Sequence, residues 1–243
     1  MKKVIYLLIL AVTLLLIPNK NTYAQTSMES TNTLTAKQKS IIAISALTAQ
    51  GELQSLQLAL NQGLDKSLTI NEIKEILVHL YAYCGFPRSI RGLQTVMEVL
   101  DERQAKGIND NSGAEASPIT DERSKYEQGK ANLEKLVGRP LPEIQSGYAA
   151  FAPIIEVFLK EHLFADLFQR DVLTFAEREL VTISVIAAIG KAEPMLRAHF
   201  GICLNVGYTP EQLNEFVVAL KSSAGKREAK AAQSVLDGIL DKR

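Results

Sequence analysis

The chain has 243 residues with 27 basic and 27 acidic side chains, two cysteines and no tryptophan. Balanced charge without a basic tract argues against a nucleic-acid partner, and the scarcity of aromatic residues disfavours a surface that stacks on sugars or bases. Two cysteines can form at most one disulfide, which excludes a scaffold held together by several bridges.

The first 24 residues are predicted to be a secretory signal peptide. Lys2 and Lys3 precede an apolar run over residues 4–17, and the small-residue pattern Thr22-Tyr23-Ala24 follows. The run is shorter than the ~20 residues of a membrane-spanning helix. Neither cysteine lies near the cleavage region, so no lipid anchor is expected there. We predict an exported protein, periplasmic or secreted, with no membrane segment after cleavage.

Two stretches of the chain repeat one pattern. The segment "LTAKQKSIIAISALTAQG" (34–51) aligns without gaps with "LTFAERELVTISVIAAIG" (173–190). After a slip of one residue, "LTINEIKEILVHLYAYCG" (68–85) aligns with "YTPEQLNEFVVALKSSAG" (208–225). We therefore expect a first unit over 34–101, a linker over 102–120, and a second unit with leading helices over 121–243.

Both copies are predicted to be helical. Thr35 and Thr174 stand where a helix would begin, each with a Gln or Glu three residues later that can complete a capping box. A later helix of each copy is expected to begin at Thr69 or Thr209. Apolar residues recur with helical spacing after the first threonine of each copy, until Gly51 and Gly190 end the run. No stretch alternates long enough to predict a strand. The expected fold is all-α, with two pseudo-symmetric helical units.

The order of these motifs resembles the carboxymuconolactone decarboxylase family, which includes the alkyl hydroperoxidase D proteins. The resemblance is carried by "LTAKQKSIIAIS", "LTINEIKEIL" and "YAYCGFPRS" in the first copy. In the second copy it is carried by "LTFAERELVTISVIAAIGKAEPMLRAHFGICLNVGYTPEQLNEFV". It covers roughly residues 34–101 and 160–240. The set of motifs is specific for the family and only weakly specific for one activity.

The peroxidase branch of this family implies a Glu, a C-x-x-C pair and a His four residues after the second cysteine. His199 fits the histidine position, and Glu179 lies near the glutamate position with about one residue of slip. The two cysteine positions hold Ala192 and Met195, and the histidine position of the first copy holds Ala59. Neither copy keeps the redox pair, which argues against a two-cysteine peroxidase mechanism.

The decarboxylase branch, which keeps the histidine without the cysteines, implies chemistry on a small unsaturated lactone carboxylate without a cofactor. His199 would transfer the proton, because the ordinary pKa of histidine lies near neutrality. Arg88 or Arg197 would hold the substrate carboxylate. At most one copy would be active in this way. No His, Cys, Asp and Glu cluster has the spacing of metal ligands, so neither a metal nor a nucleotide cofactor is expected.

The two cysteines support an alternative, a hydroperoxide reductase that uses a lone thiol. Cys203 follows His199 by one helical turn, and Cys84 ends a helix where a new helix N-terminus could stabilise a thiolate. Each also has a structural reading, Cys203 as a buried small hydrophobe and Cys84 as a small residue in a tight helix junction. A third hypothesis is a non-catalytic exported binding protein.

The family resemblance also implies association of subunits. The family forms rings from repeated units, and a tandem chain supplies two units. We therefore expect a homo-oligomer, with a trimer favoured as a pseudo-hexamer.

Overall fold

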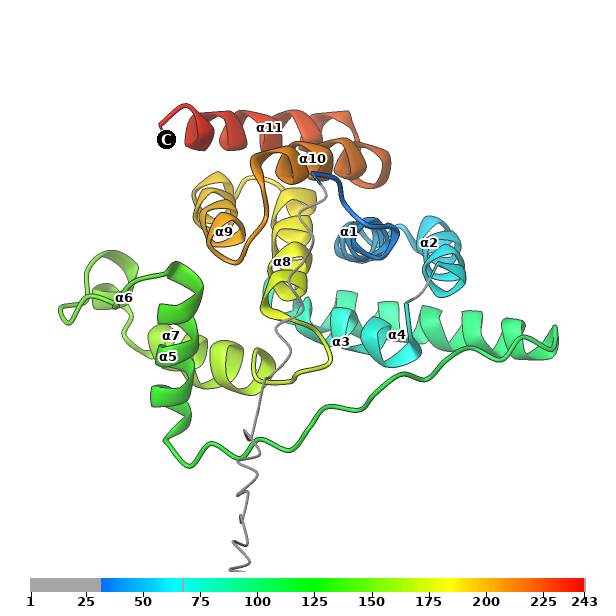
Figure 1. The fold of residues 1–243 in the computed structure, drawn as a ribbon, viewed down its shortest axis with the longest axis horizontal. Coiled ribbons are helices and arrows are strands. Elements are labelled where there is room, and N and C mark those ends of the chain that lie inside the picture. The colour runs from blue at the N-terminus through cyan, green and yellow to red at the C-terminus, as the bar shows by residue number, and fades with distance from the viewer. Residues whose placement is uncertain (1–31, 67, 243) are drawn as a thin grey trace, which may run out of the picture. The chain divides into compact units, whose positions relative to one another are not determined.

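The computed structural model describes residues 32–66 and 68–242, so the predicted signal peptide lies outside the described part. Every regular element in these residues is a helix, which confirms the predicted all-α fold (Figure 1). The elements are α1 (Ala36–Gln50), α2 (Leu53–Asp65), α3 (Ile70–His79), α4 (Tyr81–Ala105), α5 (Lys125–Val137), α6 (Gly147–Phe151), α7 (Ile154–Val157), the π-helix η1 (Phe158–Leu167), α8 (Phe175–Ile189), α9 (Glu193–Asn205), α10 (Pro210–Ala224) and α11 (Lys226–Leu240). None of the described helices is long and apolar enough to span a membrane.

The four threonines expected at helix starts all cap their helices. At the start of α1, the Gln38 amide donates to the Thr35 hydroxyl at 3.2 Å, and the Thr35 amide donates back to the Gln38 side chain at 2.8 Å. The same reciprocal pair begins the helices at the other three positions: Thr69, Thr174 and Thr209. Each box satisfies two amides that a helix start leaves without a partner.

Helices α1 and α8 form the centre of the core. Figure 1 shows them next to each other, with α2 beside α1 and α9 beside α8. Both central helices are buried on nearly every side, with Ile41 and Ile44 of α1 and Leu180 and Ile183 of α8 fully buried. A helix that is apolar all round is stable only when other helices surround it. The broad apolar faces seen in the sequence are explained by this position.

The internal repeat extends to ion pairs. In the second copy, Arg178 on α8 pairs with Glu75 on α3, at 3.1 Å between Nη2 and Oε2. At the corresponding positions, Lys39 on α1 pairs with Glu215 on α10, at 2.6 Å between Nζ and Oε1. Each pair joins the first helix of one copy to the third helix of the other. The two halves are therefore interlocked rather than separate bodies.

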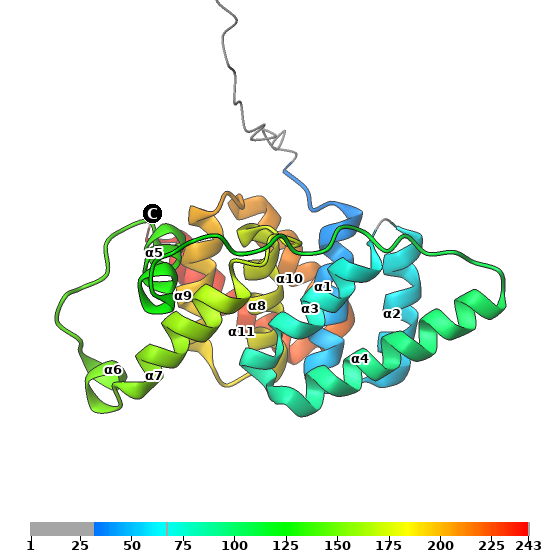
Figure 2. The same cartoon turned by 90° about the horizontal axis from the view of Figure 1, so that it is seen from below.

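The connection between the copies is an extended segment that crosses one face of the helices (Figure 2). Helix α4 continues to Ala105, so the first four residues of the predicted linker 102–120 are helical. Backbone amides of Ile70 and Asn71 donate to the carbonyls of Asn111 and Ser112, both at 2.9 Å. These bonds fix the segment against the start of α3.

Candidate functional site

The central feature of the site is a buried carboxylate beside a histidine. Glu179 lies on the second turn of α8, and its side chain is fully buried, while His199 on α9 keeps 15 % of its side chain exposed. His199 Nδ1 lies 2.8 Å from Glu179 Oε2, so the imidazole N–H donates to the carboxylate. The other oxygen, Oε1, is buried without a hydrogen-bond partner among the described residues. The contact engages only Nδ1 of His199, so Nε2 is not part of this pair.

Tyr83 of α4 brings the first copy into this site. Its ring meets the His199 ring edge-on, with 6.2 Å between the centroids. The Tyr83 hydroxyl oxygen is buried and makes no hydrogen bond of ordinary geometry within the described chain. Burial and the negative charge of Glu179 raise the pKa of Tyr83 far above its usual value, although the nearby Thr182 hydroxyl opposes part of that rise. The phenol is therefore neutral and keeps a proton to donate.

A buried polar network supports the pair from behind. Arg178 Nη1 lies 3.5 Å from His79 Nδ1, and His79 Nε2 lies 3.0 Å from the Thr182 hydroxyl. Because the Thr182 hydroxyl donates to the Arg178 carbonyl at 2.9 Å, His79 Nε2–H is the donor to Thr182. Burial, together with the positive charge of Arg178, lowers the pKa of His79 well below its usual value. The contact between His79 and Arg178 joins helices of different copies, which no local sequence pattern shows.

All three histidines of the chain touch the tyrosines of the segment "YAYCGF". Tyr83 packs against His79 at 5.4 Å between centroids as well as against His199. Tyr81 packs against His162 at 5.6 Å and stacks on Phe86 at 4.4 Å. Tyr83 stands one residue before Cys84 in the motif "YAYCGFPRS". No local sequence pattern shows which helix its ring contacts.

Both cysteines lie where a thiolate is disfavoured. Cys203 is fully buried, and burial with the charge of Glu179 raises its pKa well above the usual value. Burial raises the pKa of Cys84 to about 11, against an opposing contribution from Arg88. Its Sγ–H donates to the Leu80 carbonyl at 3.3 Å. A thiolate at Cys84 is therefore disfavoured by burial, although we expected a helix N-terminus to stabilise it. Gly85, with φ of 82°, forms the junction that follows Cys84 within α4.

The two arginines expected to bind a carboxylate lie elsewhere. Arg197 is exposed and donates to the Gly238 carbonyl at 3.1 Å, near the end of α11. The Arg88 guanidinium lies against Gly51. Arg88 lines one cavity of about 210 Å³ with Arg91 and another of about 620 Å³, and His199 lines neither. The structure therefore brings together Glu179 and His199, whereas the two guanidinium groups contact Gly51 and the Gly238 carbonyl.

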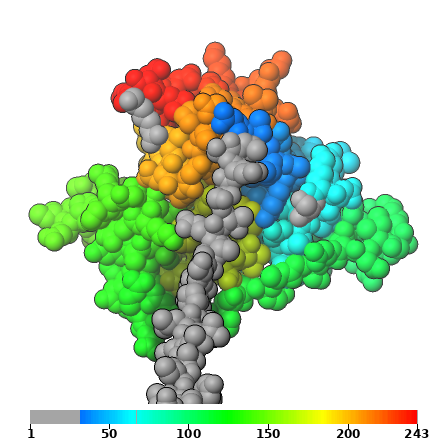
Figure 3. All heavy atoms as spheres, in the orientation of Figure 1, coloured from blue at the N-terminus to red at the C-terminus, as the bar shows by residue number. Residues whose placement is uncertain are grey.

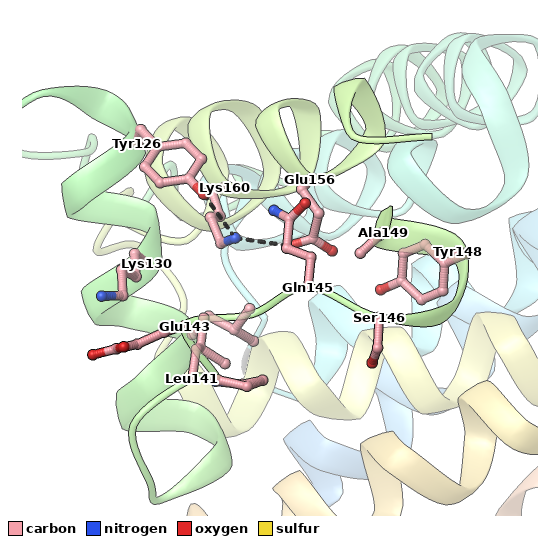
Figure 4. A pocket seen from close by; sticks show the side chains of 12 residues that line it. Tyr126, Lys130, Leu141, Glu143, Gln145, Ser146, Tyr148, Ala149, Glu156 and Lys160 are labelled. Carbon is pink, nitrogen blue, oxygen red and sulfur yellow. Dashed lines mark hydrogen bonds and ion pairs between the residues drawn. The ribbon is translucent and has the colours of Figure 1, made fainter. Parts of the chain in front are cut away.

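A separate cavity of about 330 Å³ lies among the leading helices of the second copy (Figure 4). The buried Lys160 ammonium donates to Glu156 at 2.7 Å and to the Tyr126 hydroxyl at 3.1 Å. The charged groups at its base are thus already paired with each other. Among residues 32–66 and 68–242, no three His, Cys, Asp or Glu side chains converge in a way that could hold a metal ion.

Comparison with known proteins agrees with the duplicated fold. The model of the carboxymuconolactone decarboxylase family matches residues 21–97 and 157–237, one match for each copy. The chain is also similar to a 4-carboxymuconolactone decarboxylase of Acinetobacter baylyi, with 29 % identity over 106 residues. That alignment covers 44 % of this chain and 75 % of the relative. The two family matches span most of the helical core, and the chain belongs to the carboxymuconolactone decarboxylase family.

Proposed function

We propose that the protein is a cofactor-free enzyme that removes carbon dioxide from a small unsaturated lactone carboxylate, with His199 as the proton-transfer group. The single observation that carries this proposal is the contact between His199 Nδ1 and the buried Glu179 carboxylate. A carboxylate on one ring nitrogen orients the imidazole and stabilises its charged form. The family and the name of the Acinetobacter relative supply the reaction class.

The chemistry assigns a task to each side chain. When the bond to the carboxyl carbon breaks, its electron pair passes through the conjugated double bond to the lactone carbonyl oxygen, and carbon dioxide leaves. The neutral Tyr83 hydroxyl donates a hydrogen bond to that oxygen as charge develops on it. Protonated His199 then delivers a proton to carbon through Nε2 and is reprotonated from water. One proton replaces one carbon dioxide, so atoms and charge balance.

The thiol alternative has less support. A peroxidatic cysteine needs a thiolate at neutral pH, and burial raises the pKa of both Cys84 and Cys203. The remaining alternative is an exported binding protein without catalytic activity. Turnover that depends on His199 would be found only in the proposed enzyme.

The experiment is release of carbon dioxide from 4-carboxymuconolactone by the purified protein. We expect turnover by the wild type and a loss of about 10²–10⁴-fold in kcat in His199→Ala. The matched control is His162→Ala, because His162 is half exposed and hydrogen-bonds Asp166 on its own helix. Equal activity in the His199 and His162 variants would contradict the role of His199. No turnover by a folded wild type on butenolide carboxylates would contradict the proposed reaction.

A further inference from the structure

The internal repeat gives the His199 site a counterpart in the first copy. The alignment of the two copies places three smaller residues at the corresponding positions: Ser40 for Glu179, Ala59 for His199 and Ser223 for Tyr83. The network behind the site is reduced in the same way, with Ala43 for Thr182 and Ala219 for His79. Every one of these replacements removes side-chain volume.

The removed volume is open space. Two adjoining cavities of about 670 Å³ and 230 Å³ lie at the counterpart position, and both are lined by Lys39, Ala43, Ala59 and Gln62. Ser223 and Ala219 line the larger cavity, and Ser40 lines the smaller one. The walls come from α1, α2 and α10, which are neighbours in blue, cyan and orange in Figure 3. We call these joined cavities the counterpart cleft.

The walls of the counterpart cleft combine apolar surface with positive charge. Leu47, Leu58 and four alanines supply apolar area in the larger cavity. Lys39, Lys66 and Lys221 supply three ammonium groups, against one lining carboxylate, Glu52. Lys39 is held by Glu215, but no carboxylate of the described residues lies within ion-pair distance of Lys66 or Lys221. The cleft therefore carries a net positive charge beside an apolar floor.

We propose that the counterpart cleft binds a small organic acid, with its apolar body against Leu47 and Ala59 and its carboxylate near Lys221. A cavity of several hundred Å³ with apolar walls and a few polar groups is typical of small-molecule sites. Ser55 and Ser222 line the same cavity, and their hydroxyls can donate to the carboxylate. With no histidine or glutamate at the corresponding positions, the cleft holds its ligand without turnover. This binding does not depend on the reaction proposed for His199.

The test uses benzoate as the probe and benzamide as its neutral isostere. Backbone amide NMR spectra of the full protein are titrated with each, and the Kd is taken from the shift changes. We expect benzoate to shift the amides of Ala59 and Ser222 and to bind at least fivefold more tightly than benzamide. Lys221→Glu should weaken benzoate binding at least fivefold, because it reverses an exposed charge on the wall.

Two variants that fill the cleft make the test independent of charge. Ser223→Tyr introduces the side chain that the other copy has at Tyr83, and Ala59→Phe fills the wall shared by both cavities. Either should abolish the shifts, whereas His199→Ala should leave the benzoate Kd unchanged. The proposal would be overturned if benzamide bound as tightly as benzoate, or if a folded Ser223→Tyr or Lys221→Glu variant kept the wild-type Kd. It would also be overturned if His199→Ala removed binding, since the probe would then occupy the other site.

Discussion

His199 Nδ1 and Glu179 Oε2 lie 2.8 Å apart, and the carboxylate partner is entirely buried. Glu179→Gln keeps an oxygen that can accept from the imidazole but removes the charge that stabilises its protonated form. We expect kcat to fall about 10–100-fold, less than in His199→Ala, because Gln preserves the orientation. Steady-state kinetics on 4-carboxymuconolactone would measure this fall in kcat. The control is Glu193→Gln, because Glu193 is an exposed residue of α9. A Glu179→Gln enzyme as active as the control would show that the pair is only structural.

Tyr83 is expected to act through its hydroxyl and not only through its ring. Tyr83→Phe keeps the edge-on contact with His199 and removes the buried donor. We expect kcat to fall about 10²–10³-fold with little change in thermal stability, as when one donor to a developing oxyanion is lost. Tyr81→Phe is the matched control, since Tyr81 stacks on Phe86 and lies two residues away. Equal kinetics in both variants would remove Tyr83 from the mechanism.

Cys84 is expected to react slowly with electrophiles. Burial raises its pKa from the usual 9.0 to about 11, so the thiolate fraction at pH 7 is about 100-fold below that of an ordinary cysteine. Alkylation by iodoacetamide, followed by mass spectrometry, should accelerate about tenfold per pH unit between pH 7 and 10. Cys203 is fully buried and should stay unmodified in the native protein. Rapid sulfenic acid formation at Cys84 in peroxide at pH 7 would revive the thiol peroxidase hypothesis.

His79 is expected to make the fold sensitive to acid. Its pKa is held well below 6.5 in the native protein, whereas in the unfolded chain it is near 6.5. Below pH 6.5, His79 is protonated in the unfolded chain but stays neutral in the native protein. The free energy of unfolding therefore falls by up to about 1.4 kcal/mol per pH unit. Above pH 6.5 this contribution is fully present.

Urea unfolding at pH 7.5 and pH 5.5 would measure this effect. We expect the loss of stability on acidification to be smaller in His79→Gln than in the wild type. The exposed His162→Gln serves as the control and should keep the wild-type difference. If His79→Gln keeps the whole wild-type difference, some other group causes the acid sensitivity.

The fold could be predicted from the sequence because the patterns that mark helix starts and ends are local. The four threonines that stand before an apolar run with helical spacing all begin helices. The spacing of Thr and Glu is not enough without that run, because Thr95 and Glu98 have it and lie inside α4. The candidate site could be predicted only in part. Glu179 and His199 were both named from their family positions, but their hydrogen bond joins residues 20 positions apart on different helices.

The rest of the site depends on contacts between the two copies. His79 meets Arg178 and Thr182 across about 100 residues of chain, and Tyr83 meets His199 across a similar span. No periodicity within one helix encodes such a contact. For Arg88 and Arg197, the sequence does not show the direction of the side chain, and their guanidinium groups lie against Gly51 and the Gly238 carbonyl.

Joining two copies in one chain also removes a constraint on their sequences. In a symmetric pair of separate subunits, a tyrosine that faces the partner's histidine must appear on both sides of the interface. Here the half with His199 receives Tyr83 from the other half, while the reciprocal positions are Ala59 and Ser223. Covalent fusion guarantees that unlike halves always meet in a one-to-one ratio. The interface around His199 can therefore keep its polar groups while the reciprocal interface around Ala59 and Ser223 does without them.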